Sequence, residues 1–282
     1  MVSIREVAET QAQGNVGVIY SDIRKVLGVP FVNLIYRHLA TTPAVLDCVW
    51  RAIRPHFVSG AFAAQAVLVR QEAAGIVERW PLRHAGLSSG SARDSAVRLI
   101  QLYNEANSLN LTALLHLLGS SSSTAVYESP ARKRTQETVE RPAATPATRS
   151  ALPRLPEFKE LQEPEVALIH RLNEYAEPDA PTIVASLYRH LAAWPGTLQT
   201  VQTILAPLQE QGLLDEGRQL TSQAAARIAA AHPLPIPKLI DAFHNNYETR
   251  LRQFAAITIS KMIPIGTALA MAFDARPAGS MN

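Results

Sequence analysis

One eleven-residue stretch occurs twice in this chain of 282 residues, and this repetition limits the folds that the chain can adopt. Residues 36–46 read YRHLATTPAVL and residues 188–198 read YRHLAAWPGTL, with seven identities at a constant offset of 152. Further along, residues 99–104 match residues 239–244 at an offset of 140. Duplication of one structural unit is the simplest explanation.

Both units are predicted to be helical, because their apolar residues recur at helical spacing and no segment alternates as a strand does. In the first unit, helices are expected at residues 16–27, 34–40, 44–53, 61–77 and 92–106. In the second unit, they are expected at residues 164–175, 182–193, 196–205, 222–231 and 238–258. The helix at 44–53 is expected to stop before Pro55. The sequence therefore predicts an all-α fold, with two homologous repeats packed as an intramolecular pseudo-dimer.

A linker is predicted at residues 119–157, between a first repeat at 1–118 and a second at 158–282. The segment is rich in Ser, Thr and Pro and has almost no large apolar side chains. Such a composition buries too little surface to offset the entropy lost on ordering.

The charge distribution argues against binding to nucleic acid. The net charge is +3, and the 119–157 segment alone holds six basic and four acidic residues. The remainder of the chain is therefore nearly neutral, whereas a nucleic-acid-binding domain needs a basic face on its folded part.

The sequence gives no sign of secretion or of a membrane span. Lys261 and Pro264 interrupt the apolar stretches, and the N-terminus mixes Arg5 with acidic residues instead of presenting an apolar core. Cys48 is the single cysteine, so no intramolecular disulfide can form. A soluble cytoplasmic protein is the expectation.

Familiar cofactor motifs are missing. The chain has no HExxH and no GxGxxG or GxxxxGK[ST] loop. Residues 86–90 read GLSSG and match GxSxG by letter, but no strand pattern precedes them as a nucleophile elbow requires. We therefore expect no metal, no nucleotide cofactor and no serine triad.

The repeated YRHLA sequence allows two interpretations. Arg37 and His38, with Arg189 and His190, are suited to holding an anion. A pattern kept in both units also suits the packing that the units share, and we favour this second interpretation, since such side chains bury their stems and expose their tips.

Differences between the two units indicate where a ligand pocket would lie. Asn33 follows Pro30 near a helix start, and its counterpart in the second unit is Ala185. Asn107 and Tyr247 are equivalent at the offset of 140 and supply an amide and a phenol, which can orient a small polar ligand. Ordinary surface exposure, capping or core hydrogen bonding explains these residues as well.

Residues 19–33, 36–40 and 103–111 together resemble the group I α-haloacid dehalogenases. The resemblance implies an all-α pseudo-dimer whose active site lies between two repeats. It also implies hydrolysis of short 2-halocarboxylic acids without metal or cofactor. In the family, an Asp on the first helix of the second repeat activates water, which displaces halide directly and inverts the carbon. Carried onto this chain, the resemblance places Tyr20, Asn33, Asn107 and Tyr247 in the pocket.

The chain departs from the family at the catalytic residue. The helix expected at residues 164–175 contains no Asp, and an ungapped offset puts Arg171 near the expected position. An arginine there would bind a carboxylate but would not act as a base. Glu174 is the nearest carboxylate on the helix, and His170 is a second candidate base, with a pKa naturally near neutrality.

These observations leave several hypotheses open. The first is a diverged 2-haloacid dehalogenase in which Glu174 or His170 activates water. The second is a protein without catalysis that binds a small carboxylate in the same pocket. A third, a helical scaffold for protein partners, rests only on the basic, proline-rich segment at 119–157. The hypothesis for the assembly is a homodimer.

Overall fold

The computed structural model describes residues 4–82, 91–120, 152–176 and 183–274. In these ranges every regular element is helical, which confirms the predicted all-α fold. The larger elements of the first half are α1 (Gly14–Leu27), α2 (Leu34–Leu39), α3 (Pro43–Val58), α4 (Ala61–Val77) and α5 (Ser91–Ser120). Those of the second half are α6 (Glu163–Glu174), α7 (Ser186–Leu191), α8 (Thr197–Glu210), α9 (Leu213–Ala231), α10 (Asp241–Asn246), α11 (Glu248–Gln253), the π-helix η4 (Phe254–Ile259) and α12 (Ser260–Asp274). Two short 3₁₀ helices are η1 (Glu9–Gln11) and η3 (Phe158–Glu160).

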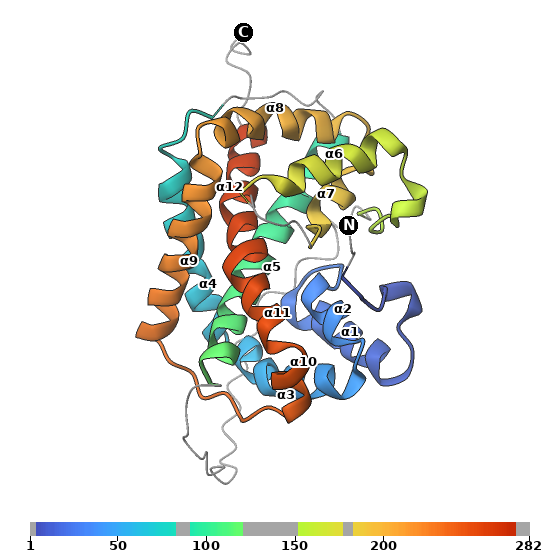
Figure 1. The fold of residues 1–282 in the computed structure, drawn as a ribbon, viewed down its shortest axis with the longest axis vertical. Coiled ribbons are helices and arrows are strands. Elements are labelled where there is room, and N and C mark those ends of the chain that lie inside the picture. The colour runs from blue at the N-terminus through green and yellow to red at the C-terminus, as the bar shows by residue number, and fades with distance from the viewer. Residues whose placement is uncertain (1–3, 83–90, 121–151, 177–182, 275–282) are drawn as a thin grey trace.

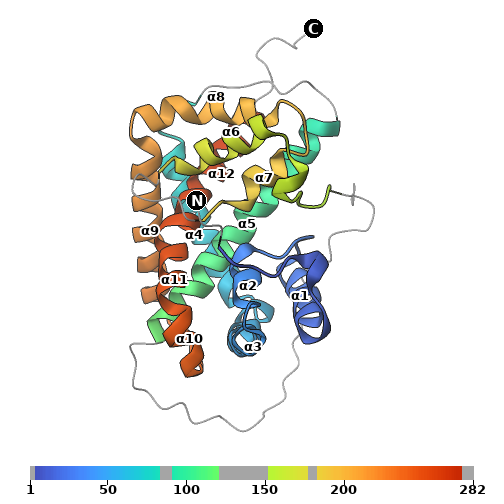
Figure 2. The same cartoon turned by 45° about the vertical axis from the view of Figure 1, so that its right-hand side comes forward.

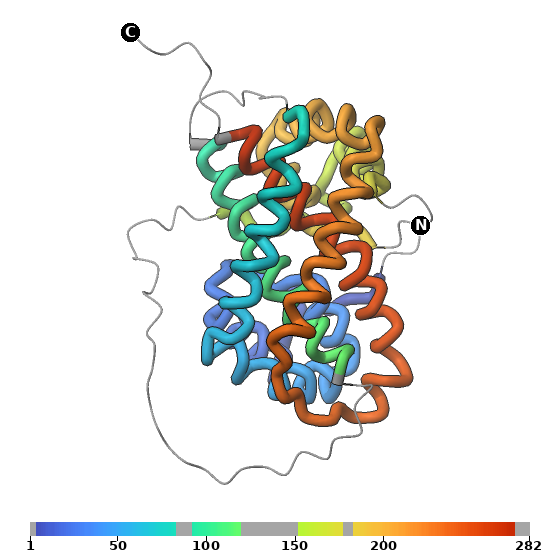
Figure 3. The backbone as a smooth tube through the Cα atoms, turned by 90° about the vertical axis from the view of Figure 1, so that its left-hand side faces the viewer, coloured from blue at the N-terminus to red at the C-terminus, as the bar shows by residue number. Residues whose placement is uncertain are grey.

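Four helices form the centre of the molecule. Helices α4 and α5 come from the first half and α9 and α12 from the second, and α12 packs against the other three (Figure 1). Helices α1 to α3 lie at one end of this bundle, and α6 to α8 lie at the other (Figure 2). The tube view shows α4 and α5 running beside α9 and α12 (Figure 3). One hydrophobic cluster therefore contains residues from both halves of the chain.

Two predicted helix ends are wrong, because both helices continue through a proline. Pro55 lies in the last turn of α3, which ends at Val58, and Pro207 lies in the last turn of α8, which ends at Glu210. The two prolines are equivalent at the offset of 152. The carbonyl of each proline still accepts the next helical hydrogen bond, from Ser59 and Gln211 respectively. A proline so close to the helix end removes one donor without stopping the helix.

The apolar C-terminal stretch is a second correction. Glu248–Phe273 is long and apolar enough to cross a membrane by length and composition, so Lys261 and Pro264 do not interrupt it as expected. In the fold, 78% of its most apolar part is buried. It spans α11, η4 and most of α12. The helical chain therefore continues beyond residue 258, at which the predicted helix ends. Burial in the protein core explains its composition.

The predicted linker lies largely outside the described residues. Helix α5 continues to Ser120, past the expected start of the linker at 119, and residues 121–151 are not described. The chain is described again from residue 152 and forms η3 just after residue 157. The division into repeats at 1–118 and 158–282 therefore stays a prediction.

Gly217 on α9 packs closely against the side chains of Trp80 and Pro264. A Cβ atom at this position would lie 2.6 Å from Cζ2 of the buried Trp80, and 3.4 Å from Cβ of Pro264. We expect Gly217→Ala to lower the free energy of unfolding by about 1–3 kcal/mol, because overpacking outweighs the gain in helix propensity of up to about 1 kcal/mol.

Gly75 on α4 supplies the matched control for this prediction. It is also helical, and no atom lies within 4 Å of a Cβ built there. Gly75→Ala is therefore expected to be neutral or to stabilise by up to about 1 kcal/mol. Urea denaturation of both variants checks the prediction, and equal stabilities would contradict it.

Candidate functional site

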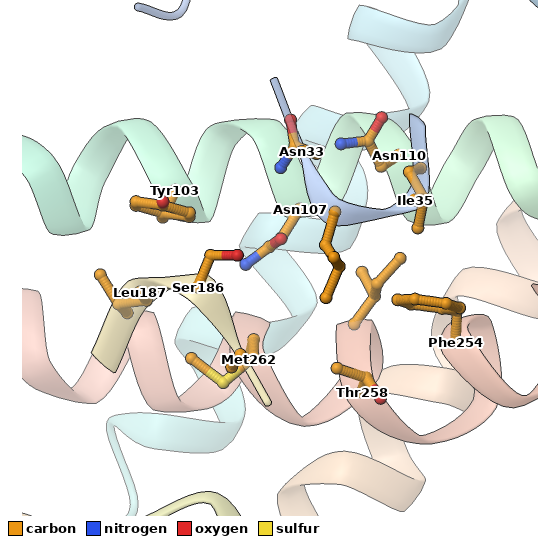
Figure 4. A pocket seen from close by; sticks show the side chains of 13 residues that line it. Asn33, Ile35, Tyr103, Asn107, Asn110, Ser186, Leu187, Phe254, Thr258 and Met262 are labelled. Atoms are coloured by element: carbon orange, nitrogen blue, oxygen red, sulfur yellow. The ribbon is translucent and has the colours of Figure 1, made fainter. Parts of the chain in front are cut away.

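A cavity of about 40 Å³ lies where α2, α5, α7, η4 and α12 meet (Figure 4). Its polar lining residues are Asn33, Tyr103, Asn107, Asn110, Ser186 and Thr258. Its apolar lining residues are Leu34, Ile35, Ala185, Leu187, Phe254, Ile259 and Met262. One water molecule needs about 10–15 Å³ by this measure, so the cavity suits a ligand of only a few heavy atoms.

The starts of α2 and α7 form two walls of the cavity. Asn33 and Ala185 precede these helices with extended backbone, and each turns the chain so that the next residues face the cavity. They are equivalent at the offset of 152. Both helices run for six residues through the repeated YRHL sequence. The repeated sequence therefore places the two segments that meet at this cavity.

Asn173 fixes the wall that α7 contributes. Its side chain is fully buried on α6, and Nδ2 donates to the carbonyl of Ile183 at 3.0 Å. Its Oδ1 accepts a hydrogen bond from the backbone N–H of Ala185 at 2.9 Å. Sequence reasoning missed this residue. A signal was available, because Asn173 lies on the same helix face as the buried Ile169 and Leu172, where an amide needs a partner.

The π-helix η4 brings three side chains to the opposite wall. Phe254, Thr258 and Ile259 all line the cavity. The wider turn is followed by Ser260, whose hydroxyl donates to the carbonyl of Ala255 at 2.6 Å. Single π-turns of this kind occur frequently at functional sites.

Three polar atoms at the cavity are buried and have no hydrogen-bond partner. They are Oδ1 of Asn33, Nδ2 of Asn110 and Oγ1 of Thr258. Asn110 is oriented by the hydroxyl of the buried Tyr36, which donates to its Oδ1 at 2.8 Å and leaves Nδ2 as the unused donor. Buried polar groups are almost always paired, so a cluster of unpaired ones indicates a site for a polar ligand or water.

The two copies of the repeated arginine converge behind Ser186. Nη2 of Arg37 donates to Oγ of Ser186 at 3.0 Å, and Nε of Arg37 lies 2.8 Å from the carboxylate of Glu6. Arg189 lies 3.9 Å from the same carboxylate. Burial lowers the pKa of Arg189, and the like charge of Arg37 lowers it further. Two cations thus share one carboxylate close to the cavity.

Tyr103 connects the cavity to His190. The Tyr103 hydroxyl lies 3.3 Å from Nδ1 of His190, and the Tyr103 ring stacks on Phe31 with 4.1 Å between centroids. Tyr103 and His190 are both buried. Burial raises the pKa of Tyr103, against the opposing effect of Arg37 and Arg189. Burial also lowers the pKa of His190.

Of the residues predicted to bind substrate, the structure brings Asn33 and Asn107 together at the cavity. It does not bring Tyr20, Tyr247 or Arg171 there. The Tyr20 hydroxyl donates to the carbonyl of Val7, and the Tyr247 hydroxyl bonds to Thr41 and Thr42. Arg171 is exposed on α6.

The two predicted bases also lie away from the cavity. Glu174 is the exposed last residue of α6. His170 stacks on Phe158 with 5.7 Å between ring centroids. Neither lines the cavity, since the inward face of α6 is formed by Ile169, Leu172 and Asn173. Among the described residues, no group of three or more His, Cys, Asp or Glu side chains is placed to hold a metal ion.

Comparisons with known proteins identify relatives of one kind. Residues 30–138 match the family described as halocarboxylic acid dehydrogenase DehI. An (R)-2-haloacid dehalogenase of Pseudomonas putida is 27% identical over 106 residues, which is 34% of this chain and 35% of that relative. Part of the chain is therefore similar to proteins that are described as acting on halocarboxylic acids. The matched part spans about a third of the length of that relative.

Solved structures extend the likeness to the whole fold. A mutant D-2-haloacid dehalogenase superimposes with a TM-score of 0.75 at 17% identity, covering 96% of each chain. A complex of D-2-haloacid dehalogenase with L-LA superimposes with a TM-score of 0.68 at 18% identity, covering 96% of this chain and 94% of the other. At these identities the likeness concerns the fold alone.

Proposed function

We propose that the chain is a cofactor-independent 2-haloacid dehalogenase whose substrate is a short 2-halocarboxylic acid bound in the cavity. Water would displace the halide directly and invert the carbon, as the family resemblance implies. The observation that carries the proposal is the set of unpaired polar atoms of Asn33, Asn110 and Thr258 around one small cavity. The haloacid dehalogenase relatives supply the substrate class.

The cavity residues divide into two groups that suit the two ends of such an acid. Nδ2 of Asn110 and the hydroxyl of Ser186 are donors for a carboxylate, and Arg37 behind Ser186 favours negative charge. Ile35, Phe254 and Met262 offer apolar surface to the alkyl group and the halogen. In this proposal the cavity lies between two duplicated repeats. The matching starts of α2 and α7, and the matching positions of Pro55 and Pro207, support that duplication.

A second candidate is a protein that binds a small carboxylate without hydrolysing it. One observation favours it: none of the residues described at the cavity carries a carboxylate that could act as the base. The roles predicted for Glu174 and His170 as water-activating bases stay predictions, and either residue would have to reach the cavity from outside it.

Halide release tests the proposal. The purified chain is incubated with each enantiomer of 2-chloropropionate and 2-bromopropionate, halide is measured by ion chromatography, and the lactate formed is analysed on a chiral column. We expect release with inversion at C2. Binding of the same acids is followed in parallel by isothermal titration calorimetry.

A matched pair of asparagine variants links the activity to the cavity. Asn107→Ala removes an amide that points from α5 into the space between α2 and α7, and is expected to weaken acid binding about tenfold or more. Asn246→Ala changes an exposed amide and is expected to leave binding unchanged. Binding without halide release favours the second candidate, and absence of binding refutes both.

A further inference from the structure

We propose that Tyr103 and His190 form the proton acceptor of the cavity: the Tyr103 hydroxyl contacts the attacking water, and His190 receives the proton through it. This inference rests on the proposed hydrolysis. It assigns the base that the sequence left open between Glu174 and His170. Tyr103 lines the cavity, and His190 lies directly behind it.

The hydrogen bonds of His190 determine which nitrogen carries the proton. Nε2 lies at hydrogen-bond distance from the backbone carbonyl of Pro153. A carbonyl oxygen only accepts, so Nε2 must be the protonated nitrogen. In the neutral ring Nδ1 then holds the free lone pair, and the Tyr103 hydroxyl, 3.3 Å away, donates to it. This arrangement orients the oxygen lone pairs of Tyr103 away from His190.

Packing holds the pair in this geometry. The Tyr103 ring stacks on Phe31 at an interplanar angle of 14°, and Phe31 also meets the edge of the His190 ring. His190 is 2% exposed. The rings therefore have little freedom to rotate, and the hydrogen bond between them is set by the fold. A long bond of this kind shortens when a substrate completes the site.

Burial and the neighbouring arginines keep the His190 ring neutral. Burial lowers its pKa below the ordinary value of 6.5, and Arg189 and Arg37 lower it further. The hydrogen bond to Pro153 and the carboxylate of Glu9 oppose this shift. The ring is therefore neutral at pH 7, which is the form that the proton transfer requires.

The proposed step forms one bond at C2 of the substrate and breaks one. The water oxygen forms a bond to C2, and the carbon–halogen bond breaks with its electron pair leaving on the halide. One water proton passes to the Tyr103 oxygen as the Tyr103 proton passes to Nδ1 of His190. The products are the 2-hydroxy acid, halide and an imidazolium, which returns its proton to solvent before the next turnover. Tyr103 is the catalytic residue, and His190 acts through it.

Tyr103→Phe tests this assignment, because it removes the hydroxyl and keeps the ring that stacks on Phe31. We expect kcat for halide release to fall about 100-fold or more, with KM changed by less than about threefold. Tyr175→Phe is the matched control, since Tyr175 does not line the cavity, and it is expected to keep the activity of the unsubstituted chain.

The dependence of kcat/KM on pH supplies a readout that a structural role would not change. In the unsubstituted chain kcat/KM should fall as pH drops through the pKa of His190, below 6.5, because protonated Nδ1 cannot accept. Tyr103→Phe should lose this inflection. An unsubstituted chain that releases halide, together with a Tyr103→Phe variant of equal rate, would overturn the pair and leave the proposed function standing.

Nitrogen NMR tests the pair without relying on turnover, and its first readout needs only the unsubstituted chain. With ¹⁵N-labelled histidine at pH 7.5, Nε2 of His190 is expected to be protonated and Nδ1 to be free. The Nδ1 resonance should shift in Tyr103→Phe. A protonated Nδ1 would overturn the proposal. Absence of halide release from a chain that binds 2-chloropropionate would refute the proposed function instead, and with it the catalytic use of this pair.

Discussion

Replacing Asn173 with alanine is expected to lower the free energy of unfolding by about 2–5 kcal/mol, because two backbone groups lose their partners in the protein interior. The Asn173 amide donates to the carbonyl of Ile183 and accepts from the N–H of Ala185. Alanine makes neither bond, and the site is fully buried, so water does not replace them. The segment that carries Ala185 and Ser186 to the cavity would lose its attachment to α6.

Urea denaturation with a set of asparagine and aspartate variants checks this expectation. Asn173→Asp keeps an acceptor for Ala185 but turns a carboxylate oxygen toward the Ile183 carbonyl, so we expect it to destabilise as much as alanine at pH 7. Asn246→Ala removes an exposed amide and should change stability by less than about 0.5 kcal/mol. An Asn173→Ala variant as stable as Asn246→Ala would show that the segment at 183–185 is held by other contacts.

The part of the site that the sequence could predict is the part built by local sequence. The duplicated YRHLA stretches indicated two equivalent helices and made Asn33 and Ala185 equivalent positions, although α7 begins at Ser186 and not at the expected residue 182. Both residues line the cavity. Local signals suffice here, because a helix start depends on a few neighbouring residues.

Contacts between distant residues could not be predicted in this way. Tyr103 and His190 are 87 positions apart, and their hydrogen bond depends on how α5 packs against α7. The resemblance assigned Tyr20 and Tyr247 to the pocket by the motifs in which they lie. In the structure the Tyr20 hydroxyl is hydrogen-bonded to Val7, and the Tyr247 hydroxyl is hydrogen-bonded to Thr41 and Thr42. The position of each phenol depends on these partners, which the sequence does not show.

The length of α5 was underestimated for a related reason. The helix was expected to end at residue 106, but it continues to Ser120. The next turns place the polar residues Ser108, Asn110 and Thr112 at buried positions. These residues interrupt the apolar pattern by which a buried helix face is recognised in a sequence. The hydroxyls of Ser108 and Thr112 bond to carbonyls four residues earlier, so these polar residues fit a buried helix.

Acidification is expected to destabilise the chain between pH 6.5 and pH 4, and His116 is expected to carry a large share of the effect. Burial lowers the pKa of His116 to about 4, with a smaller contribution from the nearby His56. Nε2 of His116 donates to Oε1 of Gln65, whose own amide donates to the backbone carbonyl of His232. The buried ring is thus held in its neutral form.

The sign of the effect follows from proton linkage. The folded pKa is depressed below the unfolded value of 6.5, so between pH 6.5 and about 4 the unfolded chain binds a proton that the folded chain does not. Stability is therefore full above pH 6.5 and falls by up to about 3 kcal/mol as the pH approaches 4. The pKa values of His38 and His190 are also lowered by burial, and they add to the fall with the same sign.

Denaturation in urea from pH 7.5 to pH 4.5 measures this dependence, and two glutamine variants assign it. His116→Gln replaces the titrating ring with an amide that can still donate to Gln65, so the slope of stability against pH should become shallower. His232→Gln changes an exposed side chain while keeping the carbonyl that Gln65 uses, and should keep the original slope. Equal slopes in all three proteins would mean that His116 titrates alike in the folded and unfolded chains, and the acid sensitivity would then have to come from His38 and His190.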